Sequence, residues 1–282
     1  MTVTLDLIKE LRAKTGVGMA DCKKALEETS GDLEKAIEYL RKKGASLAAK
    51  RADKMTNEGA VKDALSDDRK KGVIVEINCE TDFVAKGDDF QKFSNDVAKT
   101  ALDNNISDLD SLLKANLNGL SVQETLDGLM GKLGEKIEIK KIENVSAEDG
   151  FITDYIHFGS KLGGLVAFKG NKTDESLDLG RKIAMQVVAM NPMALTRDAI
   201  SSDVVEKEKE IYKTLAVQEG KPENIIDKIV SNKLEKFYQE NVLLEQSFLQ
   251  DEKKTVEEIL NEFNKKSGNT LSISKMVRFQ LG

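Results

Sequence analysis

The chain has 282 residues, of which 40% are hydrophobic and 33% are charged. This composition supports folded domains rather than general disorder, and the length favours two or three domains over a single core. A total of 43 Lys and Arg against 49 Asp and Glu gives a net charge of −6. Because affinity for DNA or RNA depends on neutralising phosphates, this balance argues against a direct nucleic-acid partner.

Cysteine and histidine are scarce in the sequence. Cys22 and Cys79 are the only cysteines and His157 is the only histidine, which excludes a disulfide scaffold and the common zinc spacings. We therefore expect reduced thiols, no metal and no cofactor. Residues 1–10 mix charged and apolar side chains without an apolar export core, and no stretch is apolar enough to span a membrane. We expect a cytoplasmic protein without a membrane partner.

The first part of the chain, residues 1–44, has apolar side chains at helical spacing and predicts three short helices. Leu5, Ile8 and Leu11 form the first stripe, and Thr4 can cap that helix. Three helices of this length can close a small bundle. We expect residues 1–54 to form a helical head followed by a linker.

A glycine-flanked turn, Gly16–Met19, separates the first two predicted helices. Val17 and Met19 in this turn either contact a partner or pack between the helices, and the pattern leaves both interpretations open. Residues 44–57 carry basic side chains diluted among alanines. We interpret them as a partly helical linker rather than a nucleic-acid-binding arm.

The central part of the chain alternates strand and helix patterns twice. The first series predicts strands at 60–65 and 73–79, helices at 88–103, 109–117 and 122–133, and a strand at 136–142. The second series predicts strands at 151–157 and 165–168, helices at 177–190 and 255–260, and a final strand at 275–281. Both series read strand, strand, helix, helix, strand, which indicates a duplication whose sequences have diverged.

One insertion interrupts the second series. Residues 204–217 and 225–237 carry apolar side chains at helical spacing among many charges, and Gly220 and Pro222 lie between them. Gly ends one helix and Pro begins the next, so the segment 201–241 is predicted to be an antiparallel coiled-coil arm. The arm either contacts a second copy or a partner, or is a self-contained solvated hairpin.

The stretch Glu80–Lys86 connects a buried strand to the helix at 88–103, and we interpret it as a short polar connection. Asp82 and Phe83 in it offer a charged acceptor beside a large apolar side chain. Binding residues collect on such connections because the flanking elements hold them rigidly. The alternative is that Phe83 covers the core while Asp82 or Asp88 caps the next helix.

Sequence motifs of enzymes are mostly absent from the chain. It contains no G-x-S-x-G elbow, no Walker phosphate loop and no G-x-G-x-x-G fingerprint. A thiol enzyme would require Cys79 and His157 to meet in space. The residues themselves therefore describe a binding protein with a head, a double α/β body and an arm.

Two stretches resemble signatures of the bacterial translation elongation factor Ts family: Leu11–Leu26, LRAKTGVGMADCKKAL, and Asn78–Ala85, NCETDFVA. The resemblance covers essentially the whole chain and implies an α+β fold with a ubiquitin-associated-like three-helix head and linker at residues 1–54. It further implies two related α/β subdomains with antiparallel sheets, at residues 55–145 and at 146–200 with 242–282, and a coiled-coil hairpin at 201–241. Some members of the family have a further carboxy-terminal helical module, and the contacts of that module are not among those expected for this sequence.

The family catalyses guanine-nucleotide exchange on the GTPase elongation factor Tu, so the resemblance implies this function and this partner. It implies that Asp82 and Phe83 insert near the magnesium and phosphate site of the GTPase. The partner-binding residues that it implies are Thr81, Asp82, Phe83, Val84, Val17, Met19, Asp21, Lys23, Leu133, Gly134 and His157. The turn around His157 varies in the family, so its role follows less directly.

Several alternatives stay open at this point. A homodimer or a 2:2 complex with the GTPase could form through the coiled coil. A different function class is a non-exchanging adaptor or scaffold that uses the head and the arm to join partners. The third is the thiol enzyme based on Cys79 and His157.

Overall fold

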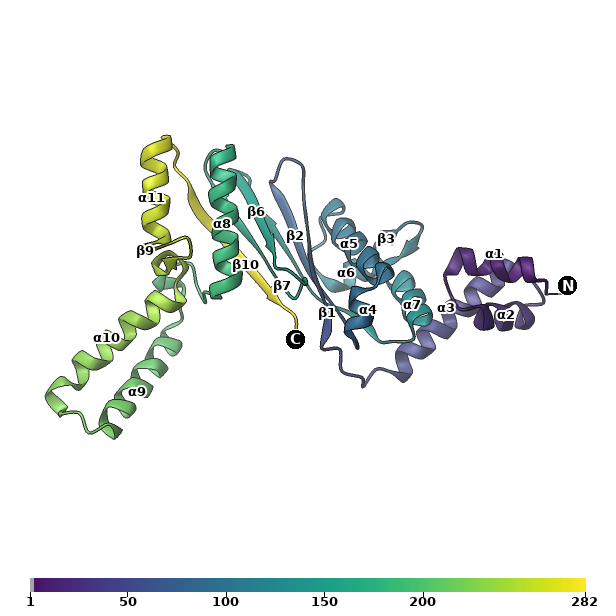
Figure 1. The fold of residues 1–282 in the computed structure, drawn as a ribbon, viewed down its shortest axis with the longest axis horizontal. Coiled ribbons are helices and arrows are strands. Elements are labelled where there is room, and N and C mark those ends of the chain that lie inside the picture. Colours follow the sequence, from purple (N-terminus) through teal and green to yellow (C-terminus); the bar gives the residue numbers. More distant parts are fainter. Residues whose placement is uncertain (1–2) are drawn as a thin grey trace.

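The computed structural model describes residues 3–282 and shows an elongated molecule (Figure 1). The helices α1, α2 and α3 lie at one end, the hairpin of α9 and α10 projects at the other, and the two three-stranded sheets with their covering helices lie between them. The mixed helical and antiparallel-sheet architecture confirms the α+β class.

Both three-stranded sheets have the same antiparallel topology. The first has the order β1-β2-β5, from strands Glu58–Leu65, Lys71–Cys79 and Ile137–Ser146. The second has the order β10-β7-β6, from strands Ser272–Gln280, Leu162–Lys169 and Gly150–Ile156. In each sheet the second strand in the chain is central and pairs with both the first and the last strand. The repeated pattern predicts the pairing of the first two strands, but not the position of the last one.

The two sheets pack face to face and helices cover their outer faces, which gives four layers (Figure 1). Val73, Val75 and Ile77 of β2 face the helices of the first half, whereas Ile74 faces the second sheet. Because both faces of β2 are covered, its apolar run is continuous rather than alternating.

The covering helices are α5 (Asp88–Asp103) and α7 (Val122–Leu133) on the first sheet, and α8 (Asp174–Met190) and α11 (Val256–Ser267) on the second. The smaller elements are α4 (Asp82–Lys86), α6 (Leu109–Lys114), η1 (Arg197–Ala199), η2 (Leu243–Glu245), β3 (Asn116–Leu117), β4 (Leu120–Ser121), β8 (Ser247–Phe248) and β9 (Asp251–Thr255). Leu117, predicted to end a helix, instead lies in the short strand β3.

A two-stranded hairpin followed by a capped helix occurs in both halves, which the sequence patterns did not predict. Strands β3 and β4 precede α7, and β8 and β9 precede α11. Ser121 and Glu124 form a capping box at the start of α7, and Thr255 and Glu258 form the same box at α11. The matching strings SVQE and TVEE carry this signal in the sequence.

The head consists of α1 (Leu5–Thr15), α2 (Met19–Glu28) and α3 (Leu33–Lys50). Ile8 and Leu11 are buried in its core, but Leu5, predicted in the same stripe, is 57% exposed. Helix α3 continues to Lys50, so the first half of the predicted linker, residues 44–50, is helical. Its Gly44 packs against the backbone of α7, which fixes the head to the first half.

The arm is an antiparallel pair of helices, α9 (Ser202–Gln218) and α10 (Glu223–Asn241). At its base Arg197 donates to the carboxylates of Glu235 and Glu245, with N–O distances of 2.5–2.9 Å. The same guanidinium lies over the ring of Tyr238, 4.3 Å from its centroid. None of the helices within residues 3–282 is long and apolar enough to span a membrane.

Candidate functional site

The stretch after β2 forms the one-turn helix α4 rather than an irregular connection, and it presents an exposed aromatic ring. Thr81 caps α4 because its Oγ1 accepts a hydrogen bond from the N–H of Val84 at 3.4 Å. Phe83 is 84% exposed, so it does not cover the core. Neither Asp82 nor Asp88 caps the next helix, since the N-cap of α5 is Gly87. We call α4 with Asp82 and Phe83 the tip.

The ionised state of Asp82 is stabilised at the surface. The ammonium of Lys86, one helical turn further, donates to Asp82 Oδ2 at 2.6 Å. This hydrogen bond lowers the pKa of Asp82 below its ordinary value, and the charge of Lys161 contributes in the same direction. The tip therefore presents a carboxylate beside an aromatic ring at neutral pH.

The turn between β6 and β7 lies beside the tip and carries His157. Lys161 in this turn forms an ion pair with Glu58 of β1 at 2.7 Å, and the carbonyl of Ser160 accepts from the N–H of Val61 at 2.7 Å. These contacts fix the turn to the same edge of the body as α4. His157 is exposed, and its Nδ1 lies 3.1 Å from Tyr155 Oη.

Phe158, which the sequence patterns did not single out, is the most exposed large apolar residue described at 97%. It follows His157 at the turn, where Gly159 and Ser160 have φ values of 84° and 56°. An aromatic side chain in such a turn has no core to enter. The pair Phe-Gly between two predicted strands is the signal that could have identified it.

The predicted contact residues Leu133 and Gly134 also lie next to the tip. They end α7, where Gly134 adopts the left-handed conformation with φ 73°. Leu133 is half-buried against the first core and Gly134 is exposed. Glu135, the next residue, accepts hydrogen bonds from Thr81. The structure therefore places several predicted contact residues at one edge of the body: residues 81–84, Leu133, Gly134 and His157.

The predicted head residues form a separate surface. Val17 is only 7% exposed and packs in the head core, whereas Met19 is half-buried. Asp21 accepts from Lys43 at 2.5 Å, and exposed Lys23 pairs with Glu27 at 3.7 Å.

The surface of α2 and the tip are displaced along the long axis of the molecule (Figure 1). Within one chain the predicted contact residues of the head and the tip therefore lie on two separate surfaces. A partner must be large to meet both at once.

The thiol of Cys79 is placed for packing rather than for reaction. It is buried, and burial raises its pKa to about 12. Its Sγ donates to the carbonyl of Thr81 at 3.2 Å, whereas the ring of His157 contacts Tyr155. The structure does not form the Cys79–His157 pair that a thiol enzyme requires. Among residues 3–282, no group of three or more His, Cys, Asp or Glu side chains is placed to hold a metal ion.

Comparison with known proteins identifies relatives over almost the whole chain. The family described as elongation factor TS matches residues 80–282. Elongation factor Ts of Chlorobaculum parvum is 50% identical over 98% of this chain and 97% of its own length. Elongation factor Ts of Prosthecochloris aestuarii is 49% identical over the same shares, and that of Chlorobium phaeobacteroides is 45% identical over 99% of both chains. The chain belongs to the elongation factor Ts family.

Proposed function

We propose that this protein is a guanine-nucleotide exchange factor for elongation factor Tu and acts in the cytoplasm during translation elongation. The observation that carries the proposal is the 84% exposure of Phe83 on a short helix within the family-matched region. A binding function of this kind needs no nucleophile, metal or cofactor from this chain. It changes an equilibrium on another protein rather than a covalent bond.

In the proposed mechanism the tip enters the GTPase near its magnesium and phosphate site. Phe83 wedges between partner side chains and Asp82 adds a negative charge, which together weaken the support of the metal and the phosphates. Burial of one phenylalanine supplies about 1.5–3 kcal/mol, which corresponds to roughly one to two decades in nucleotide release. Coupling is reciprocal, so bound GDP weakens the complex by the same factor.

The other predicted contacts extend this interface. Leu133, Gly134 and His157 lie at the same edge as the tip and would meet the same GTPase domain. Val17, Met19, Asp21 and Lys23 would hold a neighbouring helix of the partner through the head. Of these, Val17 offers the least surface, because it is 7% exposed.

We also propose the division of the chain that the family resemblance implies. The head and linker occupy residues 1–54 and are ubiquitin-associated-like. The related α/β subdomains occupy 55–145 and 146–200 with 242–282, and the inserted coiled coil occupies 201–241. The exposed side chains of Ile211 and Leu215 on α9 are compatible with pairing of the arm in a homodimer or a 2:2 complex.

The proposal is tested by the release of a fluorescent GDP analogue from elongation factor Tu in the presence of excess unlabelled GDP. The wild-type protein is expected to accelerate release, and Phe83→Ala to reduce this acceleration roughly 10- to 100-fold. Leu249→Ala is the matched control, because Leu249 is also exposed, at 44%, but lies in the second half. Binding without faster release by the wild-type protein would instead establish the adaptor or scaffold function.

A further inference from the structure

Helix α4 is too short to determine its own orientation. It has five residues, and a single helical turn is not stable without tertiary contacts. Of the five residues of α4, only Ala85 is buried, and the side chain of Phe83 packs against almost nothing in this chain. The direction in which Phe83 points therefore depends on what holds the ends of α4.

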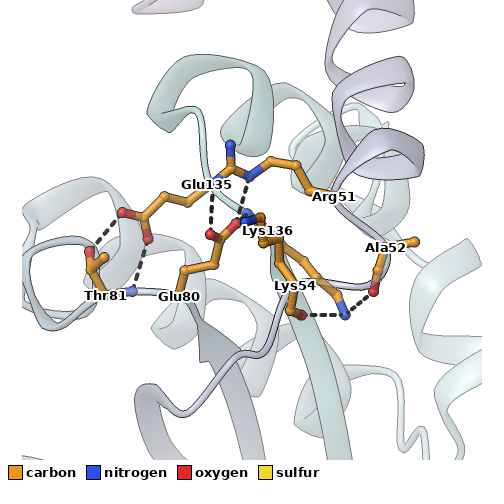
Figure 2. A network of polar contacts seen from close by, with 7 residues as sticks. All are labelled: Arg51, Ala52, Lys54, Glu80, Thr81, Glu135 and Lys136. Atoms are coloured by element: carbon orange, nitrogen blue, oxygen red, sulfur yellow. Dashed lines mark hydrogen bonds and ion pairs between the residues drawn. The ribbon is translucent and has the colours of Figure 1, made fainter.

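Glu135 holds the amino-terminal end of α4. Its Oε2 accepts from the N–H of Thr81 at 3.0 Å, and its Oε1 accepts from the Oγ1 hydroxyl of Thr81 at 2.7 Å (Figure 2). Both hydrogen bonds go to a charged acceptor, which makes them stronger than neutral ones. Because Thr81 is the N-cap of α4, these two bonds fix the residue from which the helix starts.

The preceding residue, Glu80, is held from two other segments. Arg51 Nε and Nη2 each donate to one oxygen of Glu80 at 2.7 Å, and the N–H of Lys136 donates to Oε1 at 2.6 Å. The ammonium of Lys136 in turn donates to the carbonyls of Ala52 at 2.9 Å and Lys54 at 3.3 Å.

We call this polar network the tip clamp; its side chains come from Arg51, Glu80, Thr81, Glu135 and Lys136 (Figure 2). It joins the segment that follows α3, the start of α4 and the segment that follows α7. The chain reverses into this last segment at Gly134, whose left-handed conformation ends α7. The tip is thereby connected to the same helix, α7, against which Gly44 of the head packs.

We propose that Glu135 is a positioning residue for the exchange reaction, because it fixes the angle at which α4 presents Phe83. This inference rests on the proposed function. Glu135 does not itself enter the partner; it removes the freedom of α4 before binding, so that less ordering is required in the complex. Its loss therefore lowers the maximal release rate, while the rest of the interface keeps the half-saturating concentration close to that of the wild type.

The test uses Glu135→Ala and the milder Glu135→Gln, whose amide retains one acceptor oxygen for Thr81. With the GDP-release assay at saturating protein, Glu135→Ala is expected to lower the maximal rate roughly tenfold, since small displacements of a positioned group have large effects on rate. Glu135→Gln is expected to lie between Glu135→Ala and the wild type. Glu143→Ala is the control, because Glu143 lies on strand β5, which begins two residues after Glu135, but pairs with Lys275, at 2.7 Å.

A double-mutant cycle with Phe83→Ala separates positioning from general destabilisation. If Glu135 acts through Phe83, Glu135→Ala has almost no further effect in the Phe83→Ala background. Additive defects, or an unchanged maximal rate, would overturn the inference. If the melting temperature of Glu135→Ala is more than about 5 °C below that of the wild type, Glu135→Gln replaces it in the double-mutant cycle, and the same outcomes support or overturn the inference.

The GDP-release assay distinguishes a wrong proposed function from a wrong role of Glu135. If the wild-type protein does not accelerate release, the proposed function is wrong. If the wild type accelerates release and Glu135→Ala equals Glu143→Ala, only the role of Glu135 is wrong.

Discussion

The crossing of α3 over α7 leaves no room for a side chain at Gly44, and we predict that Gly44→Ala displaces the head. A Cβ atom at Gly44 would lie 3.0 Å from the carbonyl carbon of Asp127 and closer still to its oxygen. A Cβ atom at Gly131 would lie 3.1 Å from Gly44 Cα. Because the obstructing atoms belong to a helix backbone, they cannot rotate away as the end of a long side chain can.

Two opposing effects determine how much Gly44→Ala changes the free energy of head docking. Alanine is more favourable than glycine inside a helix by about 0.8–1 kcal/mol. Overpacking a tight contact costs about 1–3 kcal/mol, and separation of the helices also strains the nearby ion pair between Arg41 and Glu124. We expect the packing of the head against α7 to lose about 1–2 kcal/mol of stability. The fraction of molecules in which the head is separated from α7 then rises roughly 5- to 30-fold.

Gly128 of α7 provides the matched control, because an added Cβ there has no heavy atom within 4 Å. Gly128→Ala is expected to be neutral or stabilising by up to about 1 kcal/mol. The assay is hydrogen exchange followed by mass spectrometry on peptides from α3 and α7. Faster exchange in Gly44→Ala, with none in Gly128→Ala, is the expected result. Equal exchange in the two variants would refute the close-packing argument.

Three further predictions concern other residues. Phe158→Ala should leave the melting temperature unchanged, because this side chain is 97% exposed, and should weaken binding to elongation factor Tu up to roughly tenfold in a titration. Burial and the charge of Asp154 raise the pKa of Asp63 to about 6, so the folded state loses stability as pH rises from about 4 to 6. Asp63→Asn should therefore be more stable than the wild type in urea at pH 7.5, by about 1–3 kcal/mol, and equal to it below pH 4. Arg51 lowers the pKa of Glu80 to about 2, so Glu80→Gln should be less stable at pH 7 by about 1–2 kcal/mol, and this difference should shrink as pH falls from about 4.5 to 2.

The sheets and long helices could be predicted because their burial is periodic. Strand β2 is covered on both faces, and its run of β-branched residues predicts it directly. Helix α8 carries buried Leu179, Ile183 and Val187 at helical spacing and ends at Met190, with Asn191 as its C-cap before Pro192. Such elements can be recognised from the local sequence, because one or both faces of the helix or strand must be apolar along its whole length.

Other features could not be predicted because their causes are not local. Gly44 suggested a break in α3, since glycine is a poor helix former, but the approach of α7 requires it there. The one-turn helix α4 is too short to show a period, and Glu135, which holds its N-cap, is 54 positions away from Thr81. The pairing of Arg51 with Glu80 likewise depends on where the head docks.

The tip, which we propose to be a contact surface, is an addition to an arrangement of strands and helices that occurs in both halves. In the second half Thr173 follows β7 and caps α8 directly. In the first half Thr81 occupies the corresponding place after β2, but the helix that it caps is α4. Helix α5 follows α4, and its N-cap, Gly87, provides no side-chain hydrogen bond. The tip is thus a one-turn insertion between a capping threonine and its helix, and only the first half has it. The shared elements can then keep a covered core in both halves, while the inserted turn, which has almost no core of its own, is free to meet another protein.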